Sequence, residues 1–182
     1  MSAIEPNDII QFWLGVGEKK WYAVDPKLDA KIRERFEKLW REARDGKLSE
    51  WETSAEGSLG LLILTDQFPR NMFRGKADAF ATDALARDVA RRALARGYDM
   101  AFSSDARSFF YLPFMHSENI SDQDFCVKLI GERLGMKSVN FPFALGHRDT
   151  ILRFGRFPAR NAALGRRSTE AEKAFIAKAQ PH

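Results

Sequence analysis

Apolar residues recur along most of the chain at the three- and four-residue spacing of an α-helix, and no long stretch alternates apolar with polar residues as a strand would. The clearest example is the segment from residue 28 to 43, whose apolar side chains share one helical face: Leu28, Ile32, Phe36, Leu39, Trp40 and Ala43. A second segment, residues 59–64, is apolar on all sides and predicts a central helix. The pattern therefore predicts an all-α fold.

Capping residues and glycines divide this pattern into about eight helices. Asp25-Pro26 is typical of a helix start, and the pair Thr169–Glu172 has the spacing of a capping box. We expect Asn7 to cap the first helix and the pair Ser121–Asp124 to begin another. The expected helices cover approximately residues 7–13, 26–45, 54–67, 79–96, 104–115, 122–134, 142–154 and 170 onward.

Short connections between these helices favour antiparallel helix pairs, stacked as a bundle or as a right-handed α-α array. The length of 182 residues favours a single domain over residues 1–182. No clear repeat of about 34 residues is present, so periodicity alone does not identify a repeat family. One short internal similarity joins Phe68-Pro69-Arg70-Asn71 to Phe157-Pro158-Ala159-Arg160-Asn161.

The composition is that of a folded globular chain, with 45% apolar and 30% charged residues. The single cysteine, Cys126, excludes an intrachain disulfide and every Cys-x-x-Cys motif, and it suits a reducing compartment. Residues 9–17 lack the basic start of a secretory signal, and no apolar run approaches the length of a membrane span. We therefore expect a cytoplasmic protein without a membrane segment, and we interpret Cys126 as a core residue.

Positive charge is concentrated in one part of the chain, although the net charge of +4 is modest. Residues 147–167 contain a single acid, Asp149, and the following arginines: Arg148, Arg153, Arg156, Arg160, Arg166 and Arg167. Such a run can attract an anion, and it can also be an ordinary solvated face. Nucleic acid is a disfavoured partner, because neither zinc-finger spacing nor an aromatic-interleaved basic motif accompanies the arginines.

A dense polar motif, Asp66-Gln67-Phe68-Pro69-Arg70-Asn71, directly follows the central helix. Pro69 should end that helix, because proline disfavours the helical conformation at the residue before it. A carboxylate at the edge of a core is costly unless it is paired, so Asp66 could hold an arginine in a structural pair. Alternatively, Arg70 and Asn71 could grip a ligand carboxylate or phosphate, with Asp66 as an orienting group or a weak catalytic candidate.

A second polar group occupies residues 107–118. On a helix, Arg107, Tyr111 and Glu118 would share roughly one face, and Arg107 and Tyr111 are candidate ligand-binding residues. His116 and Glu118 are weak catalytic candidates, because an imidazole near a carboxylate can move protons near neutral pH. The alternative for both is helix capping and core pairing. One histidine with one or two acids is too small a set to predict a metal site.

The third polar group occupies residues 147–161, where a glycine and a proline constrain a turn after a predicted helix end. This turn would display Arg156, Arg160 and Asn161 as candidate ligand-binding residues. Alternatively, it is a basic turn tied to helix C-termini. The three polar groups would suit an anionic ligand if they met in one groove.

The motifs, in this order, resemble the signatures of a widespread bacterial family of unknown function with a tetratricopeptide-like helical fold. The similar segments are Phe12-Trp13-Leu14-Gly15, the 66–71 motif, Tyr111-Leu112-Pro113-Phe114-Met115-His116-Ser117-Glu118, Arg153-Phe154-Gly155-Arg156-Phe157-Pro158 and Leu164-Gly165-Arg166. They span nearly the whole chain. The chain departs from the family pattern at Ala159, where the pattern has a histidine, so a histidine role would pass to His116 or His147.

The resemblance implies antiparallel helix pairs stacked into a tetratricopeptide-like superhelix, no cofactor and no particular reaction. Three functions remain open. The chain could be a binding module whose groove takes an acidic peptide, a protein or a small anionic ligand. It could be an enzyme acting on a small anionic substrate, with His116 or Glu118 transferring protons. Its motifs could also be helix corners whose polar groups satisfy one another.

Overall fold

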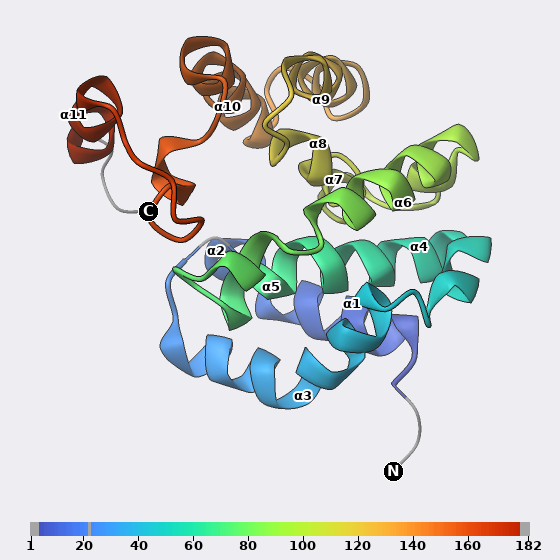
Figure 1. The fold of residues 1–182 in the computed structure, drawn as a ribbon. Coiled ribbons are helices and arrows are strands. Elements are labelled where there is room, and N and C mark those ends of the chain that lie inside the picture. The colour runs from blue at the N-terminus through green and yellow to red at the C-terminus, as the bar shows by residue number, and fades with distance from the viewer. Residues whose placement is uncertain (1–3, 22, 179–182) are drawn as a thin grey trace. The chain divides into compact units, whose positions relative to one another are not determined.

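The computed structural model describes residues 4–21 and 23–178, and within these ranges every regular element is a helix (Figure 1). The predicted all-α class is therefore confirmed. The tetratricopeptide-like stacking of helix pairs stays a prediction. In the same two ranges, no helix combines the length and the apolar character needed to cross a lipid bilayer.

Contacts between residues divide the chain into two units. Unit 1 comprises Met1–Arg74 and Asp78–Pro113, and unit 2 comprises Gly75–Ala77 and Phe114–His182. The short helix α8 (Leu112–Met115) contains residues of both units. The single domain expected over residues 1–182 stays a prediction.

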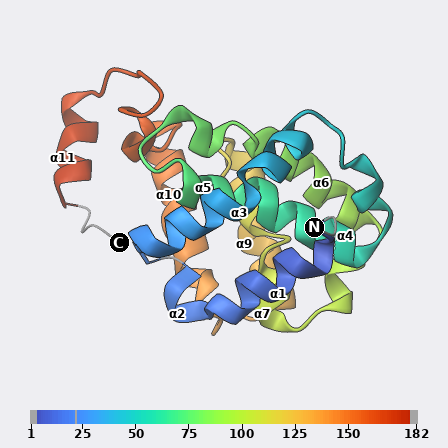
Figure 2. The ribbon, with the colours of Figure 1, turned by 90° about the horizontal axis from the view of Figure 1, so that it is seen from below.

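The helices of unit 1 lie in layers around α4. Up to Ser108 the elements are α1 (Pro6–Val16), α2 (Glu18–Trp21), α3 (Pro26–Arg44), η1 (Ser49–Thr53), α4 (Ala55–Leu62), η2 (Ile63–Gln67), α5 (Phe68–Met72), η3 (Ala77–Phe80), α6 (Asp83–Ala95), η4 (Tyr98–Ala101) and α7 (Ser104–Ser108). The first residue of η3, Ala77, belongs to unit 2. Helix α4 packs against α1 and α6, and α3 packs against α5 and η2 (Figure 1). Figure 2, seen from below, shows α3 crossing one face of this unit.

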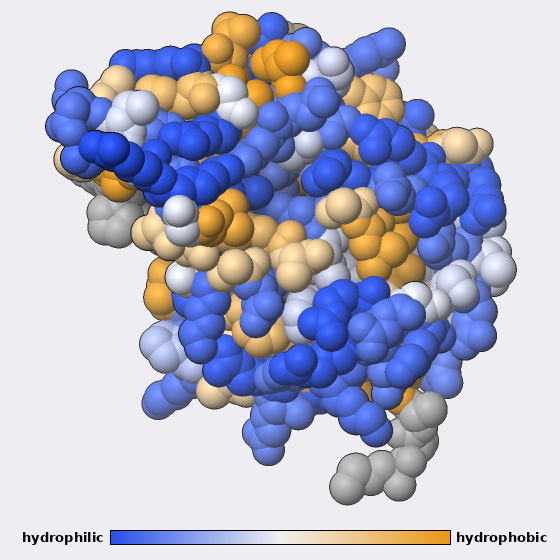
Figure 3. All heavy atoms as spheres, in the orientation of Figure 1, coloured by the Kyte–Doolittle hydropathy of each residue, from blue (hydrophilic) through white to orange (hydrophobic). Residues whose placement is uncertain are grey.

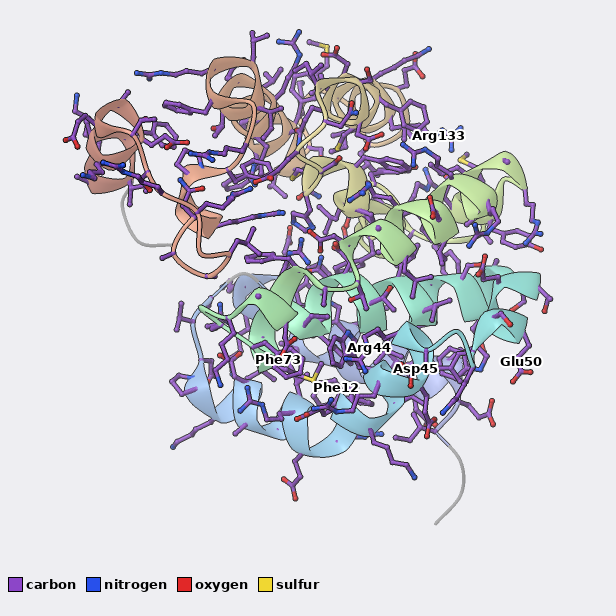
Figure 4. The ribbon with its side chains drawn as sticks, viewed as in Figure 1. Phe12, Arg44, Asp45, Glu50, Phe73 and Arg133 are labelled. Carbon is purple, nitrogen blue, oxygen red and sulfur yellow. The ribbon has the colours of Figure 1, made fainter. Side chains whose placement is uncertain are left out.

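Aromatic side chains fill the centre of unit 1. The Phe68 ring lies 4.8 Å from that of Phe36 and 5.5 Å from that of Trp13, and all three residues are fully buried. Phe12, labelled in Figure 4, packs edge-on against Phe36 at 5.1 Å. Residues 59–64 are buried on all sides, which confirms the predicted central helix. Each fully buried large apolar side chain contributes about 1.5–3 kcal/mol relative to an exposed one.

Two predicted helix starts are confirmed. The Asp25 side chain caps α3 by accepting the backbone N–H groups of Lys27 at 3.0 Å and Leu28 at 3.1 Å. The Thr169–Glu172 capping box begins α11 (Glu170–Lys178): the Thr169 N–H donates to the Glu172 carboxylate at 2.7 Å, and the Glu172 N–H donates to Thr169 Oγ1 at 3.2 Å.

Two other predicted starts are wrong by one or two positions. Helix α1 is capped by Glu5 rather than by Asn7. Glu5 directly precedes Pro6, the first residue of the helix, and forms a capping box with Asp8. Helix α9 (Ile120–Arg133) is capped by Asn119, whose side chain accepts the Ser121 N–H at 2.8 Å. In both cases the capping side chain lies on the N-terminal side of the residue that the spacing selected.

The central helix does not end at Pro69, contrary to the prediction. Phe68 keeps helical backbone angles (φ −61°, ψ −37°), because the helix widens into the π segment η2 and the Phe68 N–H bonds to the carbonyl of Ile63. Proline has no N–H to offer the Thr65 carbonyl, its partner in a regular α-helix. That carbonyl instead accepts the hydroxyl of Thr82 at 2.5 Å. A side chain from outside the helix therefore satisfies the group that Pro69 leaves unpaired.

Unit 2 is built on α9 and α10 (Asn140–Phe154), which pack against each other and are joined by a short turn. The two helices approach closely at Gly131, where a Cβ atom would lie 3.3 Å from the Phe141 ring. Gly135 (φ 87°) and Gly155 (φ 69°) follow the ends of α9 and α10 in the left-handed conformation, as the sequence predicts. The short η5 (Pro158–Arg160) and α11 complete the unit.

Candidate functional site

The polar motif of unit 1 is buried, and its groups bond to one another. Asp66 is 1% exposed, and its carboxylate accepts Gln67 Nε2 at 2.6 Å. One turn later, Arg70 donates from Nη1 to the Asp66 carbonyl at 2.6 Å, and its Nη2 lies 3.0 Å from the carboxylate of Asp83 at the start of α6. The guanidinium of Arg70 thus joins α5 to α6 within unit 1.

Asn71 joins α5 to α3. Its Nδ2 donates to Asp29 Oδ1 at 2.8 Å, and the Asn71 residue is 5% exposed. Arg74 binds the same carboxylate through Nε at 2.6 Å and Nη2 at 3.1 Å. Two charge-assisted donors on one carboxylate hold the N-terminal half of α3 against the end of the central helix. This geometry supports a structural role for Asn71.

Tyr111 and Arg107 bind the turn around η4. The Tyr111 hydroxyl donates to Asp99 Oδ2 at 2.6 Å, and both residues are fully buried. Arg107 donates from Nη2 to the Phe102 carbonyl at 2.8 Å. The single helix predicted over residues 104–115 is interrupted, because α7 ends at Ser108 and α8 begins at Leu112. The shared helical face expected for residues 107, 111 and 118 is therefore absent.

In unit 2, Glu118 is held by Arg166 and by a backbone N–H. Arg166 donates from Nη1 to Oε2 at 2.7 Å and from Nη2 to Oε1 at 2.9 Å, so the pair is bidentate. The Phe157 N–H adds a third bond to Oε1 at 2.8 Å. Because Glu118 follows α8 and Phe157 precedes η5, the carboxylate fixes the turn after α10 against the chain that enters α9.

These bonds decide the protonation state of Glu118. Burial alone would raise its pKa, but the hydrogen bonds from Arg166 and the Phe157 N–H, with the charges of Arg166 and Arg160, outweigh burial and lower the pKa. The carboxylate is therefore ionised at neutral pH. A general acid needs the opposite shift, so this environment disfavours Glu118 as a proton donor.

One imidazole and one guanidinium contact the Phe157 ring and a second imidazole lies beside the first. We call His116, His147, Phe157 and Arg160 the His–Arg cluster. The imidazoles of His116 and His147 have centroids 6.4 Å apart, and His147 lies edge-on to Phe157 at 5.3 Å. The Arg160 guanidinium lies over the same ring, 4.7 Å from its centroid, and donates from Nη2 to the His116 carbonyl at 2.8 Å. Both histidines and Arg160 are partly exposed.

The tautomer of neutral His147 follows from its partner. Its Nδ1 lies 2.8 Å from the Phe143 carbonyl oxygen, one helical turn earlier on α10. A carbonyl oxygen only accepts, so Nδ1 carries the proton and donates it. The neutral ring then presents Nε2 as its basic nitrogen.

Two other predicted residues, Asn161 and Arg156, bond to the chain next to the cluster. Asn161 is 1% exposed; its Oδ1 accepts Arg166 Nε at 2.9 Å, and its Nδ2 donates to Ser168 Oγ at 3.0 Å. Arg156 pairs with Glu172 of α11 through Nε at 2.7 Å and Nη2 at 2.9 Å. The hydrogen bonds from Arg156 and from the Thr169 N–H are the main causes that lower the Glu172 pKa to about 2. Asn161 and Arg156 thus position the segment that carries Arg160.

Within the described residues, neither a reactive thiol nor a metal-binding cluster is found. Cys126 is fully buried, and burial raises its thiol pKa to about 12, in agreement with the core role expected from sequence. Across residues 4–21 and 23–178, no three His, Cys, Asp or Glu side chains stand close enough together to hold a metal ion. A thiolate mechanism therefore has no support in this part of the chain.

Residues 9–180 match a family described as bacterial protein of unknown function (DUF924). The chain belongs to this family. No curated protein matches the chain. It is similar to a solved structure, that of a protein of unknown function from Agrobacterium tumefaciens, with 42% identity and a TM-score of 0.90 over 96% of this chain and 97% of that one. The family membership expected from the motifs is confirmed for this DUF924 chain, whereas the specific motif signature stays a prediction.

The predicted site residues of this DUF924 chain fall into two sets. Unit 1 holds Asp66, Arg70, Asn71, Arg107 and Tyr111, and each is bonded within that unit. Unit 2 holds His116, Glu118, Arg156, Arg160 and Asn161. Their meeting in one groove stays a prediction.

Sequence reasoning did not select two members of the unit 2 site. Arg166 was one arginine in a basic run, and nothing in its local spacing marked it as the partner of Glu118, 48 residues earlier. Phe157 contributes through its ring and its backbone N–H. The one available signal was the similarity between the Phe-Pro segments at residues 68 and 157.

Proposed function

We propose that this chain is a binding protein whose His–Arg cluster receives a carboxylate or phosphate group, carried by a peptide, a protein or a small molecule. The observation that carries this proposal is the grouping of two imidazoles and one guanidinium, all partly exposed: His147 and Arg160 contact the Phe157 ring, and the His116 ring lies 6.4 Å from that of His147. A guanidinium is a charge-assisted donor that suits such anions, and an imidazole becomes one when its second nitrogen is protonated.

The surroundings of the cluster support the same proposal. Glu118, the acid bonded to Phe157, is neutralised by the bidentate Arg166. The Arg160 side chain is oriented by the His116 carbonyl and the Phe157 ring, so little of its rotamer freedom remains to be lost on binding. A cytoplasmic location belongs to the same proposal, because the one cysteine is buried and forms no disulfide, which suits a reducing compartment. Tetratricopeptide-like stacking of helix pairs would provide the concave surface that such binding proteins present.

The test is an NMR titration of the purified chain with inorganic phosphate and with glutarate. We expect the ring resonances of His116 and His147 to shift saturably with either anion. Arg160→Gln should weaken binding by about tenfold or more, because it removes one charge-assisted contact. Arg153→Gln is the matched control: it removes the same charge from a neighbouring exposed arginine that lies over Phe154. Equal weakening by both substitutions would reduce the proposal to unspecific electrostatic attraction.

Proton transfer is a second candidate function, favoured by the geometry of His147. Its Nδ1 is committed to the Phe143 carbonyl, which fixes the ring and its tautomer as in many general bases. His116 lies beside it, whereas Glu118 is ionised and Asp66 is buried. This candidate predicts hydrolysis of chromogenic phosphate or carboxylic esters that His147→Gln abolishes. Activity that persists in His147→Gln would reject it.

For the polar motif of unit 1, and for Tyr111 in the same unit, we propose a structural role. Asp66, Arg70, Asn71 and Tyr111 all bond to groups of unit 1, and each is at least half buried. Anion titration of Asn71→Ala would separate a structural role from ligand binding. If Asn71 is structural, the substitution lowers stability and leaves the affinity of the folded chain for phosphate unchanged.

A further inference from the structure

Three large apolar side chains are exposed at the turn between α9 and α10. Met136 is 72% exposed, Val139 58% and Phe143 52%, and we call them the apolar tip. Figure 3 shows hydrophobic side chains at the surface over α10. A single exposed apolar residue needs no explanation, but three within eight residues concentrate exposed apolar surface in one part of the chain, as a docking site does.

The apolar tip is ordered by backbone hydrogen bonds, so its exposure is built into the turn. The Gly135 N–H donates to the Ile130 carbonyl at 2.9 Å, and the Ser138 N–H donates to the Gly135 carbonyl at 3.0 Å. Phe141 turns inward, and its ring packs over Gly131 of α9. Phe143, two residues later on a helix, is directed to another side and is left at the surface.

The apolar tip leads directly to the His–Arg cluster along one stripe of α10. Val139, Phe143 and His147 follow one another at four-residue intervals, the spacing that places side chains one above the other on a helix. The Phe143 carbonyl accepts the His147 Nδ1–H at 2.8 Å, so the last apolar residue and the first imidazole are bonded neighbours. An apolar contact and an anion contact thus lie within about 6–12 Å along the helix axis.

The charge around this stripe indicates which kind of partner it would bind. Residues 133–148 contain no acid, and Arg133, which ends α9 and is labelled in Figure 4, and Lys137 carry positive charge there, whereas Arg148 is paired with Asp124 of α9. A second copy of the same surface would bring like charges together, which opposes self-association. An acidic partner would complement the stripe.

We propose that the stripe binds an acidic peptide segment, with a carboxylate in the His–Arg cluster and an apolar side chain on the apolar tip. This inference rests on the proposed function and narrows its ligand. An extended peptide advances about 3.3 Å per residue, so the apolar residue of the partner lies about two to four residues from its acid. The two contacts together favour a segment of a protein over a free small anion.

The experiment measures the affinity of ten-residue peptides for the intact chain by fluorescence anisotropy. The first peptide carries two leucines placed two to four residues from two glutamates. The second replaces the leucines by serine, and the third replaces the glutamates by glutamine. We expect the first peptide to bind about tenfold more tightly than either other, as the loss of a buried apolar side chain or of a charge-assisted contact predicts.

Substitutions in the stripe test the placement of the leucines. Phe143→Ser should weaken binding of the first peptide by about tenfold and leave the second unchanged. Leu152→Ser is the matched control, because Leu152 is 65% exposed on the same helix but lies outside the stripe. Circular dichroism of each variant checks that α10 still forms. Equal effects of Phe143→Ser and Leu152→Ser would overturn the proposal.

The remaining outcomes separate this inference from the proposed function. If phosphate, glutarate and the serine peptide bind as tightly as the leucine peptide, anion binding stands and the apolar contact is rejected. If neither the peptides nor the small anions bind, both proposals fail. Binding to anionic phosphatidylserine vesicles that requires Phe143, without binding of the leucine peptide, would assign the apolar tip to a lipid surface and overturn the peptide proposal.

Discussion

Asp99 is a fully buried carboxylate, and the Tyr111 hydroxyl donates to it at 2.6 Å. Removing that hydroxyl deprives a buried acceptor of a donor, while the ring of Phe fills the same space. We therefore expect Tyr111→Phe to lower the free energy of unfolding by about 1–3 kcal/mol, the cost of removing a hydrogen-bond donor from a buried acceptor. Urea denaturation followed by tryptophan fluorescence measures this change.

Tyr98→Phe is the matched control for Tyr111→Phe. The Tyr98 hydroxyl donates to the Thr53 carbonyl at 2.9 Å, but in an exposed position where water can replace it. Its loss should cost less than about 0.5 kcal/mol. If both substitutions had the same small effect, Tyr111 would be available for the ligand role that its sequence context suggested.

The identity of polar residues at a site can be read from the sequence more easily than their partners. Arg70, Asn71 and Glu118 stood out because they follow apolar helices, where a polar group needs a reason. Their partners lie elsewhere in the chain: Asn71 bonds to Asp29, 42 residues earlier, and Glu118 bonds to Arg166, 48 residues later. Local spacing carries no information on such pairs, so the choice between structural and ligand contact required the fold.

At the scale of the secondary-structure elements, local signals worked where a single side chain satisfies a helix end. Asp25 and the Thr169–Glu172 pair form capping hydrogen bonds with residues at most three positions away, and the sequence predicted both caps. The prediction that the helix ends at Pro69 was wrong. The hydroxyl of Thr82, from outside the helix, donates to the Thr65 carbonyl, which proline leaves without a donor. The continuation of the helix past Pro69 is therefore accompanied by a tertiary contact that propensity rules omit.

The attachment of α11 should depend on pH through Glu172. Hydrogen bonds from Arg156 and the Thr169 N–H lower the Glu172 pKa to about 2, against 4.5 for an unperturbed glutamate. As the pH falls, the unfolded chain therefore takes up this proton before the folded chain does. The stabilisation is fully present above pH 4.5 and is lost as the pH falls toward about 2.

Comparison of wild type with Glu172→Gln measures this dependence. The difference in unfolding free energy between the two chains should be constant from pH 7 to about 5 and should shrink progressively below that range. Glu170→Gln is the control, because Glu170 is exposed and pairs only with the exposed Lys173 among the contacts described. A wild-type advantage that stayed constant down to pH 3 would show that the Arg156–Glu172 pair contributes no linked stability.

At the scale of the whole molecule, the question is whether the two units unfold together. The chain passes between them at residues 74/75, 77/78 and 113/114, and α8 contains residues of both. Separate unfolding of either unit would break that helix. We therefore expect one cooperative transition in urea, as a single domain over residues 1–182 requires.

The chain supplies one probe for each unit. All four tryptophans, at positions 13, 21, 40 and 51, belong to unit 1, and Cys126 belongs to unit 2. The buried Cys126 thiol, with its pKa raised to about 12, should resist a disulfide reagent at pH 8 until unit 2 opens, whereas an unfolded thiol reacts readily. Coincident midpoints of tryptophan fluorescence and Cys126 labelling would establish a single domain. Labelling that precedes the fluorescence change would instead show that unit 2, with its His–Arg cluster, opens independently, and peptide binding should then be lost at the lower urea concentration.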